Sequence, residues 1–297
     1  MSDRRKGSVQ ASGMLRGLGV DPAGAAAGPS AISPFRDAGP VSPGRVVPIL
    51  EAVRDASSVV GEEIRLLRAR VQDACRQRRM ACIALTSSLP GEGKSTLSIG
   101  LAAALARQPG QSVVLIEMDL RRPSITRALQ IPQALGLSEW LHGHTQDVPV
   151  RQVEPGGFSL IVAGQAPLEH PELLGSARMA SLLEEAKKRF HVVLIDLMPL
   201  LPVADAALVQ DLIDGFVMVV RSRVTPRDAV QKGLRRLTAS KVIGLVLNDY
   251  SEILPTYTSY AYKRYGMAYG YRRQPDSTPP SDPVRDDRAA GAPRLRD

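Results

Sequence analysis

Short apolar runs rich in β-branched side chains recur along the middle of the chain and alternate with amphipathic stretches. Continuous runs of this kind are typical of strands covered on both faces. They predict strands at 81–86, 112–117, 158–162, 191–196, 215–220 and 242–247. Helical periodicity begins near Pro48, and later stretches predict helices near 94–107, 138–141, 177–189, 204–211 and 226–239. The pattern predicts an α/β fold with a doubly wound, mainly parallel sheet whose ligand lies at the carboxyl ends of the strands.

The two ends of the chain lack this pattern. Residues 1–47 are rich in Gly, Ala, Pro and Ser, and residues 272–297 are dominated by Pro, Asp and Arg. Segments of such composition cannot bury enough apolar surface to form a core. We therefore expect flexible, disordered tails at both ends and one folded domain at 48–249, followed by a separate segment at 250–271.

Composition and charge narrow the functional classes. The 297-residue chain has a formal net charge of +8, but much of the excess lies in the tails and in one predicted helix, and aromatic residues are few. Without a stacking platform for bases, we expect no nucleic-acid partner. No apolar run reaches the roughly 20 residues of a membrane helix, and no secretory segment precedes the domain, so we expect a cytoplasmic protein. The cysteines and histidines lack the spacing of zinc ligands.

A glycine-rich loop follows the first apolar run. Residues 87–96 read Ser-Ser-Leu-Pro-Gly-Glu-Gly-Lys-Ser-Thr, although Ser88 stands where the simplest pattern has its first glycine. A strand, a glycine-rich turn and a helix in this order direct backbone N–H groups and a helix N-terminus at a polyphosphate. The lysine of such a loop reaches the phosphates, and the next hydroxyl ligates Mg²⁺. The sequence predicts a nucleotide site formed by Pro90, Gly91, Glu92, Gly93, Lys94, Ser95 and Thr96.

Two apolar strands end in carboxylates. Glu117 and Asp119 follow one run, and Asp196 ends another. An acid at such a place can simply cap a helix, but two of them beside a phosphate loop favour metal chemistry. We expect Asp196 to act on Mg²⁺ through water. Because Glu117 and Asp119 are two residues apart on an extended segment, both can face one site.

These motifs together resemble the bacterial tyrosine kinases of capsule and exopolysaccharide systems, which are P-loop proteins of the MinD/ParA-like branch. The resemblance runs from about residue 62 to 270 and rests on Pro90-Gly91-Glu92-Gly93-Lys94-Ser95-Thr96, Glu117-x-Asp119-x-Arg121-Arg122-Pro123 and Ile195-Asp196-x-x-Pro199-x-Leu201-Pro202-Val203-x-Asp205. It implies ATP- and Mg²⁺-dependent phosphoryl transfer to tyrosine, with Lys94, Glu117, Asp119 and Asp196 as catalytic residues. It also implies that Ser95 and Asp196 ligate the metal, that Asn248 contacts adenine, and that one acid of the 117/119 pair orients or deprotonates the hydroxyl.

All seven tyrosines of the chain lie between positions 250 and 271. Composition alone also allows an aromatic adhesive patch or a low-complexity tail. The resemblance implies an autophosphorylation cluster that is delivered to the active site of a neighbouring subunit. The expected sites are Tyr257, Tyr260, Tyr262, Tyr265, Tyr269 and Tyr271.

A further motif precedes the phosphate loop. Glu62, Arg65 and Arg68 are three residues apart, which places them on one helical face. Spacing alone favours ion pairs within the helix, whereas the resemblance implies a ring-like homo-oligomer. The resemblance further implies a transmembrane adaptor of the chain-length-determinant type, which would recruit the protein to the inner face of the plasma membrane, and a tyrosine phosphatase.

Two departures from the family pattern keep other interpretations open. Glu117 stands where the family usually has aspartate, and Met198-Pro199 replaces the usual Pro-Pro. A nucleotide-binding assembly scaffold with weak or no kinase activity is therefore one alternative. A ParA/MinD-like positioning ATPase is another, although it leaves the tyrosine cluster without a role.

Overall fold

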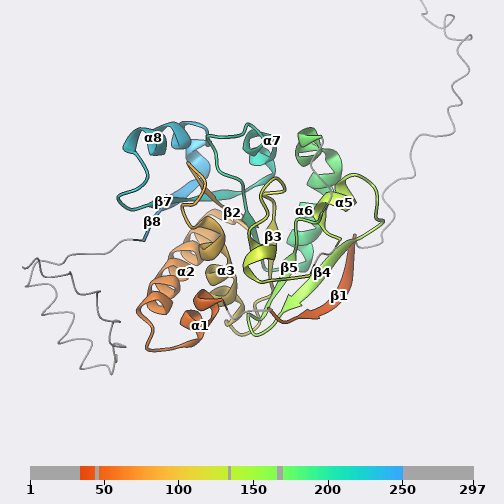
Figure 1. Ribbon diagram of the computed structural model, residues 1–297, viewed down its shortest axis with the longest axis horizontal. Coiled ribbons are helices and arrows are strands. Elements are labelled where there is room, and N and C mark those ends of the chain that lie inside the picture. The colour runs from red at the N-terminus through yellow and green to blue at the C-terminus, as the bar shows by residue number, and fades with distance from the viewer. Residues whose placement is uncertain (1–33, 44–46, 133–134, 166–169, 250–297) are drawn as a thin grey trace, which may run out of the picture.

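The computed structural model describes residues 34–43, 47–132, 135–165 and 170–249. Within this part of the chain, eight strands form one sheet in the order β1-β4-β5-β3-β6-β2-β7-β8 (Figure 1). All neighbouring strands pair in parallel except β4 and β5, which are antiparallel. The strands are β1 (Phe35–Val41), β2 (Cys82–Ser87), β3 (Val113–Glu117), β4 (Val148–Val153), β5 (Phe158–Ile161), β6 (Val192–Asp196), β7 (Gly215–Arg221) and β8 (Val242–Asn248). The expected doubly wound, mainly parallel α/β fold is confirmed.

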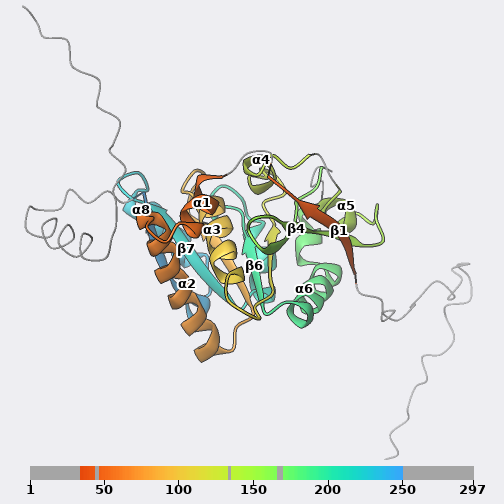
Figure 2. The same cartoon turned by 90° about the horizontal axis from the view of Figure 1, so that it is seen from below.

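Helices cover both faces of the sheet. They are α1 (Pro48–Arg54), α2 (Val59–Arg78), α3 (Lys94–Ala106), α4 (Ile125–Ala128), α5 (Leu137–Leu141), α6 (Ala177–Arg189), α7 (Ala206–Val209) and α8 (Arg227–Arg235). Figures 1 and 2 show α1, α2 and α3 gathered together, apart from α6. No helix in the described ranges is both long enough and apolar enough to cross a bilayer.

The central strands divide the interior into two cores. Ile83 and Leu85 of β2 pack with α1, α2 and α3, whereas Cys82 and Ala84 of the same strand pack with α5, α6 and α7. This follows from the period of two along a strand, which sends successive side chains to opposite faces. β2, β3 and β6 are buried along their whole length. Each therefore presents only the loop beyond its carboxyl end to a ligand.

The N-terminal boundary differs from the expectation. We expected a disordered segment at 1–47, but β1 lies within it and pairs with β4. β1 is an edge strand in which only the terminal residues Phe35 and Val41 are buried, so it leaves little apolar pattern in the sequence. The antiparallel strand β4 and the four-residue helix α4 were also not predicted. Residues 250–271, with the tyrosine cluster, and residues 272–297 lie outside the described residues.

Candidate functional site

The glycine-rich loop connects the end of β2 to the first residue of α3. Gly91 and Gly93 have φ angles of 80° and 89°, in the left-handed region that favours glycine. Gly93 is also the N-cap of α3, and a Cβ there would collide with the side-chain amide of Asn248. Pro90, Gly91 and Thr96 are exposed around the loop. The loop therefore has the conformation and the opening that a bound phosphate chain requires.

Lys94 is a buried cation between two carboxylates. Its Nζ lies 3.2 Å from Asp119 Oδ2 and 3.8 Å from Asp196 Oδ2, and it donates a hydrogen bond of 3.3 Å to Ser95 Oγ. The Lys94 side chain is only 10% exposed. A charge so removed from water needs a partner of opposite sign, and the two acids provide it. The predicted phosphate-binding lysine and two of the predicted acids thus converge at one point.

Asp196 is fully buried beneath the loop. The Ser95 hydroxyl donates to Asp196 Oδ2 at 2.6 Å, and the Ser98 hydroxyl hydrogen-bonds Oδ1 at 3.2 Å. Burial raises the pKa of Asp196 to about 6, and the Lys94 charge and the Ser95 hydrogen bond oppose that shift. Asp196 is therefore ionised above about pH 6 and can then attract a cation.

The oxygen atoms at this point suit Mg²⁺. Ser95 offers a hydroxyl and Asp196 offers a carboxylate, and these are the hard oxygen donors that Mg²⁺ prefers. Among the described residues, no group of three or more His, Cys, Asp or Glu could hold a metal ion by itself. A magnesium ion at Ser95 would thus take its remaining ligands from phosphate oxygens and water, as is usual for nucleotide sites.

Glu117 and Asp119 face different surroundings. The Glu117 carboxylate is fully buried and accepts hydrogen bonds from Ile125 N at 2.6 Å, Thr126 N at 3.2 Å and Ala163 N at 3.2 Å, and from the Thr126 hydroxyl. Asp119 accepts from Arg122 N through one oxygen and faces Lys94 with the other. Of the pair that we expected to share one site, Asp119 alone contacts Lys94.

Ser124 is a neighbour of this site that the sequence did not indicate. Its Oγ lies 2.6 Å from Ser95 Oγ, at the beginning of α4. A serine after Arg121-Arg122-Pro123 carries no motif signal of its own, because its contact depends on how the chain folds back after β3.

Two further contacts tie the surrounding loops to the site. Glu92, which is buried in the glycine-rich loop, accepts hydrogen bonds from Leu89 N and from the Thr225 hydroxyl beyond β7. The Asn248 side-chain amide donates to Glu92 O at 2.9 Å, so the residue expected at adenine contacts the loop backbone. Both contacts fix the loop from the β7–β8 side of the sheet.

The loops that carry the two acids are also joined to each other. Arg121 Nε lies 2.6 Å from Asp205 Oδ2, and Asp205 is buried. This ion pair connects the segment after β3, which carries Asp119, to the segment after β6, which follows Asp196.

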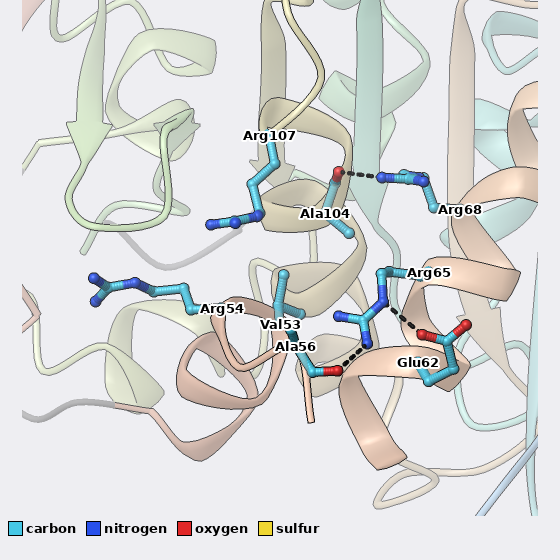
Figure 3. A pocket seen from close by; sticks show the side chains of 8 residues that line it. All are labelled: Val53, Arg54, Ala56, Glu62, Arg65, Arg68, Ala104 and Arg107. Carbon is cyan, nitrogen blue, oxygen red and sulfur yellow. Dashed lines mark hydrogen bonds and ion pairs between the residues drawn. The ribbon is translucent and has the colours of Figure 1, made fainter. Parts of the chain in front are cut away.

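The predicted assembly motif lies in α2, at the far end of α3 from the glycine-rich loop. Arg65 Nε pairs with Glu62 Oε2 at 2.7 Å, and Arg68 donates to Ala104 O at 3.5 Å (Figure 3). The three residues line a pocket of about 330 Å³ together with Val53, Arg54, Ala56, Ala104 and Arg107. Four arginines thus surround a pocket with one glutamate, and the buried Nε of Arg68 has no hydrogen-bond partner among the described residues.

Comparison with known proteins agrees with this geometry. Residues 83–254 match the CobQ/CobB/MinD/ParA nucleotide binding domain. The tyrosine-protein kinase YwqD of Bacillus subtilis is 32% identical over 71% of this chain and 89% of its own length. The succinoglycan biosynthesis transport protein ExoP of Rhizobium meliloti is 33% identical over 63% of this chain, which spans only 26% of that protein.

A solved structure extends the likeness to three dimensions. The kinase domain of the Escherichia coli tyrosine kinase ETK superposes with a TM-score of 0.62 at 30% identity, over 69% of this chain and 83% of that one. With Lys94 and the two acids at the end of the glycine-rich loop, the chain belongs to the CobQ/CobB/MinD/ParA nucleotide-binding family and, within it, to the bacterial tyrosine-protein kinases.

Proposed function

We propose that this chain is an ATP-dependent protein-tyrosine kinase that phosphorylates its own C-terminal tyrosines. The observation that carries the proposal is the convergence of Lys94, Asp119 and Asp196 at Ser95, in the first turn of α3. Phosphoryl transfer needs positioning and charge stabilisation more than covalent chemistry, and these are the groups that provide both.

The loop binds and orients the triphosphate. Backbone N–H groups at Gly91 and Gly93 and the first turn of α3 face the β- and γ-phosphates, and Lys94 neutralises their charge. A magnesium ion, when bound, withdraws charge from the same phosphate oxygens. Ser95 and Asp196 would hold that ion.

Asp119 is the proposed acceptor of the tyrosine proton. Its Oδ2 is held by Lys94 at 3.2 Å, and the phosphates of a nucleotide compete for the same ammonium group. Once Lys94 turns to the phosphates, Asp119 Oδ2 is free to accept the proton of the attacking hydroxyl. The tyrosine oxygen then bonds to the γ-phosphorus, the bond between that phosphorus and the β–γ bridging oxygen breaks, and ADP leaves.

The proposed substrates are the tyrosines at 257–271 of a neighbouring copy. Support comes from the concentration of all seven tyrosines in one short segment and from the names of the similar proteins. The same proposal includes regulation of capsular or exopolysaccharide synthesis and export, a transmembrane chain-length-determinant adaptor and a cognate phosphatase. The likeness to a succinoglycan transport protein supports this setting.

Self-assembly through α2 belongs to the same proposal. The pocket at Arg65 and Arg68 carries an excess of positive charge, which an acidic group of a second copy would balance. Val59, Val60 and Leu66 on the same helix are all more than half exposed, and exposed apolar side chains beside a charged pocket favour a protein contact.

The decisive experiment is incubation of the full chain with ATP and Mg²⁺, with and without the cytosolic segment of its adaptor, followed by detection of phosphotyrosine. We expect labelling that Lys94→Met abolishes. Mixing Lys94→Met with a variant whose cluster tyrosines are phenylalanine should restore labelling if transfer occurs between copies. A protein that binds ATP and assembles without any phosphotyrosine is a scaffold, and ATP hydrolysis with salt-sensitive DNA binding would identify a positioning ATPase.

A further inference from the structure

Three polar groups surround the Ser95 hydroxyl. Asp196 Oδ2 and Ser124 Oγ each lie 2.6 Å from Ser95 Oγ, and Lys94 Nζ lies 3.3 Å away. A hydroxyl has one proton to donate, and an ionised carboxylate can only accept. The Ser95 proton therefore goes to Asp196. It follows that Ser124 donates its own proton to Ser95 Oγ, as does the Lys94 ammonium group.

The position of Ser124 is fixed by hydrogen bonds of the residues that follow it. Ile125 N, which belongs to the peptide bond that follows Ser124, donates to Glu117 Oε1 at 2.6 Å. The same carboxylate accepts from Thr126 N and from Ala163 N, which lies just beyond β5, so it joins two separate segments to β3. A fully buried carboxylate is costly unless it is hydrogen-bonded, and these donors satisfy it.

We propose that Glu117 and Ser124 form a positioning pair for the predicted magnesium ligand Ser95. Glu117 fixes the backbone at Ser124, and the Ser124 hydroxyl fixes the rotation of the Ser95 hydroxyl. The Ser95 proton then points at Asp196, and the lone pair that now accepts from Lys94 becomes available to a cation when the lysine turns to the phosphates. This inference rests on the proposed nucleotide site and assigns Glu117 a role through Ser124 rather than a direct contact with substrate.

The side-chain length of Glu117 separates this role from a direct chemical one. Gln keeps the length and one carbonyl oxygen, so Glu117→Gln retains an acceptor for Ile125 N. Glu117→Asp keeps the charge but is shorter by one C–C bond of about 1.5 Å, so it loses reach to α4. A positioning role thus predicts that Glu117→Gln is tolerated better than Glu117→Asp. A direct role in metal binding or proton transfer predicts the reverse order.

The test measures the affinity of the full chain for ADP by calorimetry, with and without Mg²⁺. Residues that hydrogen-bond to a metal ligand typically contribute 10- to 100-fold in metal affinity. We expect Ser124→Ala to reduce the Mg²⁺-dependent gain in ADP affinity about 10-fold, while affinity without Mg²⁺ stays within about twofold. Ser124→Thr, which keeps the hydroxyl, should restore the gain, and Glu117→Asp should resemble Ser124→Ala.

A purely structural role would lower the urea midpoint of these variants without changing the Mg²⁺-dependent gain. That result would overturn the proposal, and so would a Glu117→Gln variant that loses the gain while Glu117→Asp keeps it. A wild-type chain that does not bind ADP at all refutes the proposed nucleotide site itself. ADP binding with the expected variant order but no phosphotyrosine supports the positioning pair and refutes only the kinase activity.

Discussion

Lys94 Nζ lies 3.2 Å from Asp119 Oδ2, so the predicted phosphate-binding lysine is paired with the acid that we propose as the proton acceptor. In the proposed mechanism, this contact occupies Asp119 Oδ2 until phosphate oxygens compete for the lysine. The proposal therefore predicts that nucleotide binding and the release of Asp119 from Lys94 occur together. An enzyme arranged in this way has little free base when no phosphate donor is present.

Neutralising Asp119 and Glu117 should have different effects on catalysis. Asp119→Asn removes the proposed proton acceptor, and loss of a general base typically costs 10²- to 10⁴-fold in rate. We expect phosphotyrosine formation to slow at least about 100-fold with ADP affinity preserved. Glu117→Gln is the matched control, because it removes a carboxylate two residues away that faces Ile125 and Ala163 instead. Equal losses in single-turnover rates would contradict the assignment of Asp119.

Stability should depend on pH through Asp196. Its pKa is raised on folding from 3.8 to about 6, chiefly by burial, so the folded chain binds this proton more tightly than the unfolded chain does. The resulting stabilisation is present below about pH 4 and is lost as pH rises through about 6. The shift corresponds to about 3 kcal/mol of unfolding free energy.

Urea unfolding between pH 5 and pH 8 would check this dependence. Asp196→Asn has no proton to lose, so its stability should vary less over the same range. Because a cation favours the ionised carboxylate, the stabilisation by Mg²⁺ and ADP should be larger at pH 8 than at pH 5. An Asp196→Asn variant with the same pH profile as the wild type would contradict the assignment.

Replacing Asn248 should test whether it supports the loop or selects the base. Its amide donates to Glu92 O in a partly buried hydrogen bond, and a typical intramolecular hydrogen bond contributes about 0.5–1.5 kcal/mol. We expect Asn248→Ala to weaken ADP and GDP binding equally, by about 2- to 12-fold. An adenine contact would instead reduce the preference for ADP over GDP, which competitive binding of the two nucleotides would reveal.

The double variant Arg65→Ala/Arg68→Ala should impair self-association in the presence of ATP. It removes two of the four arginines of the α2 pocket, and because the contact is electrostatic, wild-type assembly should weaken as salt rises. Arg76→Ala is a suitable control, since Arg76 lies on the same helix but pairs with Asp73 in a solvent-exposed position. Sedimentation velocity would measure the change. Assembly unaffected by the double variant would place the interface elsewhere.

The sequence located the interior of the fold well. The six strands predicted from apolar runs begin and end within one residue of the observed strands. In β2, β3 and β6, burial on both faces leaves a continuous apolar signature. The edge strand β8 has an equally apolar sequence, VIGLVLN, although none of its residues is buried. β1 and β4 were not predicted because they lack a continuous apolar run. They lie toward one edge of the sheet, and their sequences, FRDAGPV and VPVRQV, mix polar residues and proline with apolar ones.

The sequence was sufficient to predict which residues form the site, but not how their side chains are oriented and paired. Motif spacing singled out Lys94, Ser95, Asp119 and Asp196, which the structure brings together. The orientation of Glu117 could not be predicted from motif spacing. β3 ends at Glu117, so the alternation of side chains along a strand does not determine whether Glu117 and Asp119 point the same way. Ser124 meets Ser95 across 29 residues of chain, a separation that no local pattern encodes.

α3 begins at Lys94, the predicted phosphate-binding lysine, and ends beside the arginine pocket of α2. At a rise of 1.5 Å per residue, its 13 residues form a rod about 20 Å long that is buried against the sheet along most of its length. Because a helix of this length is stiff, a tilt or shift of one end also moves the other end. The proposed contacts between copies at the pocket would therefore act on the same helix that begins at the proposed triphosphate site.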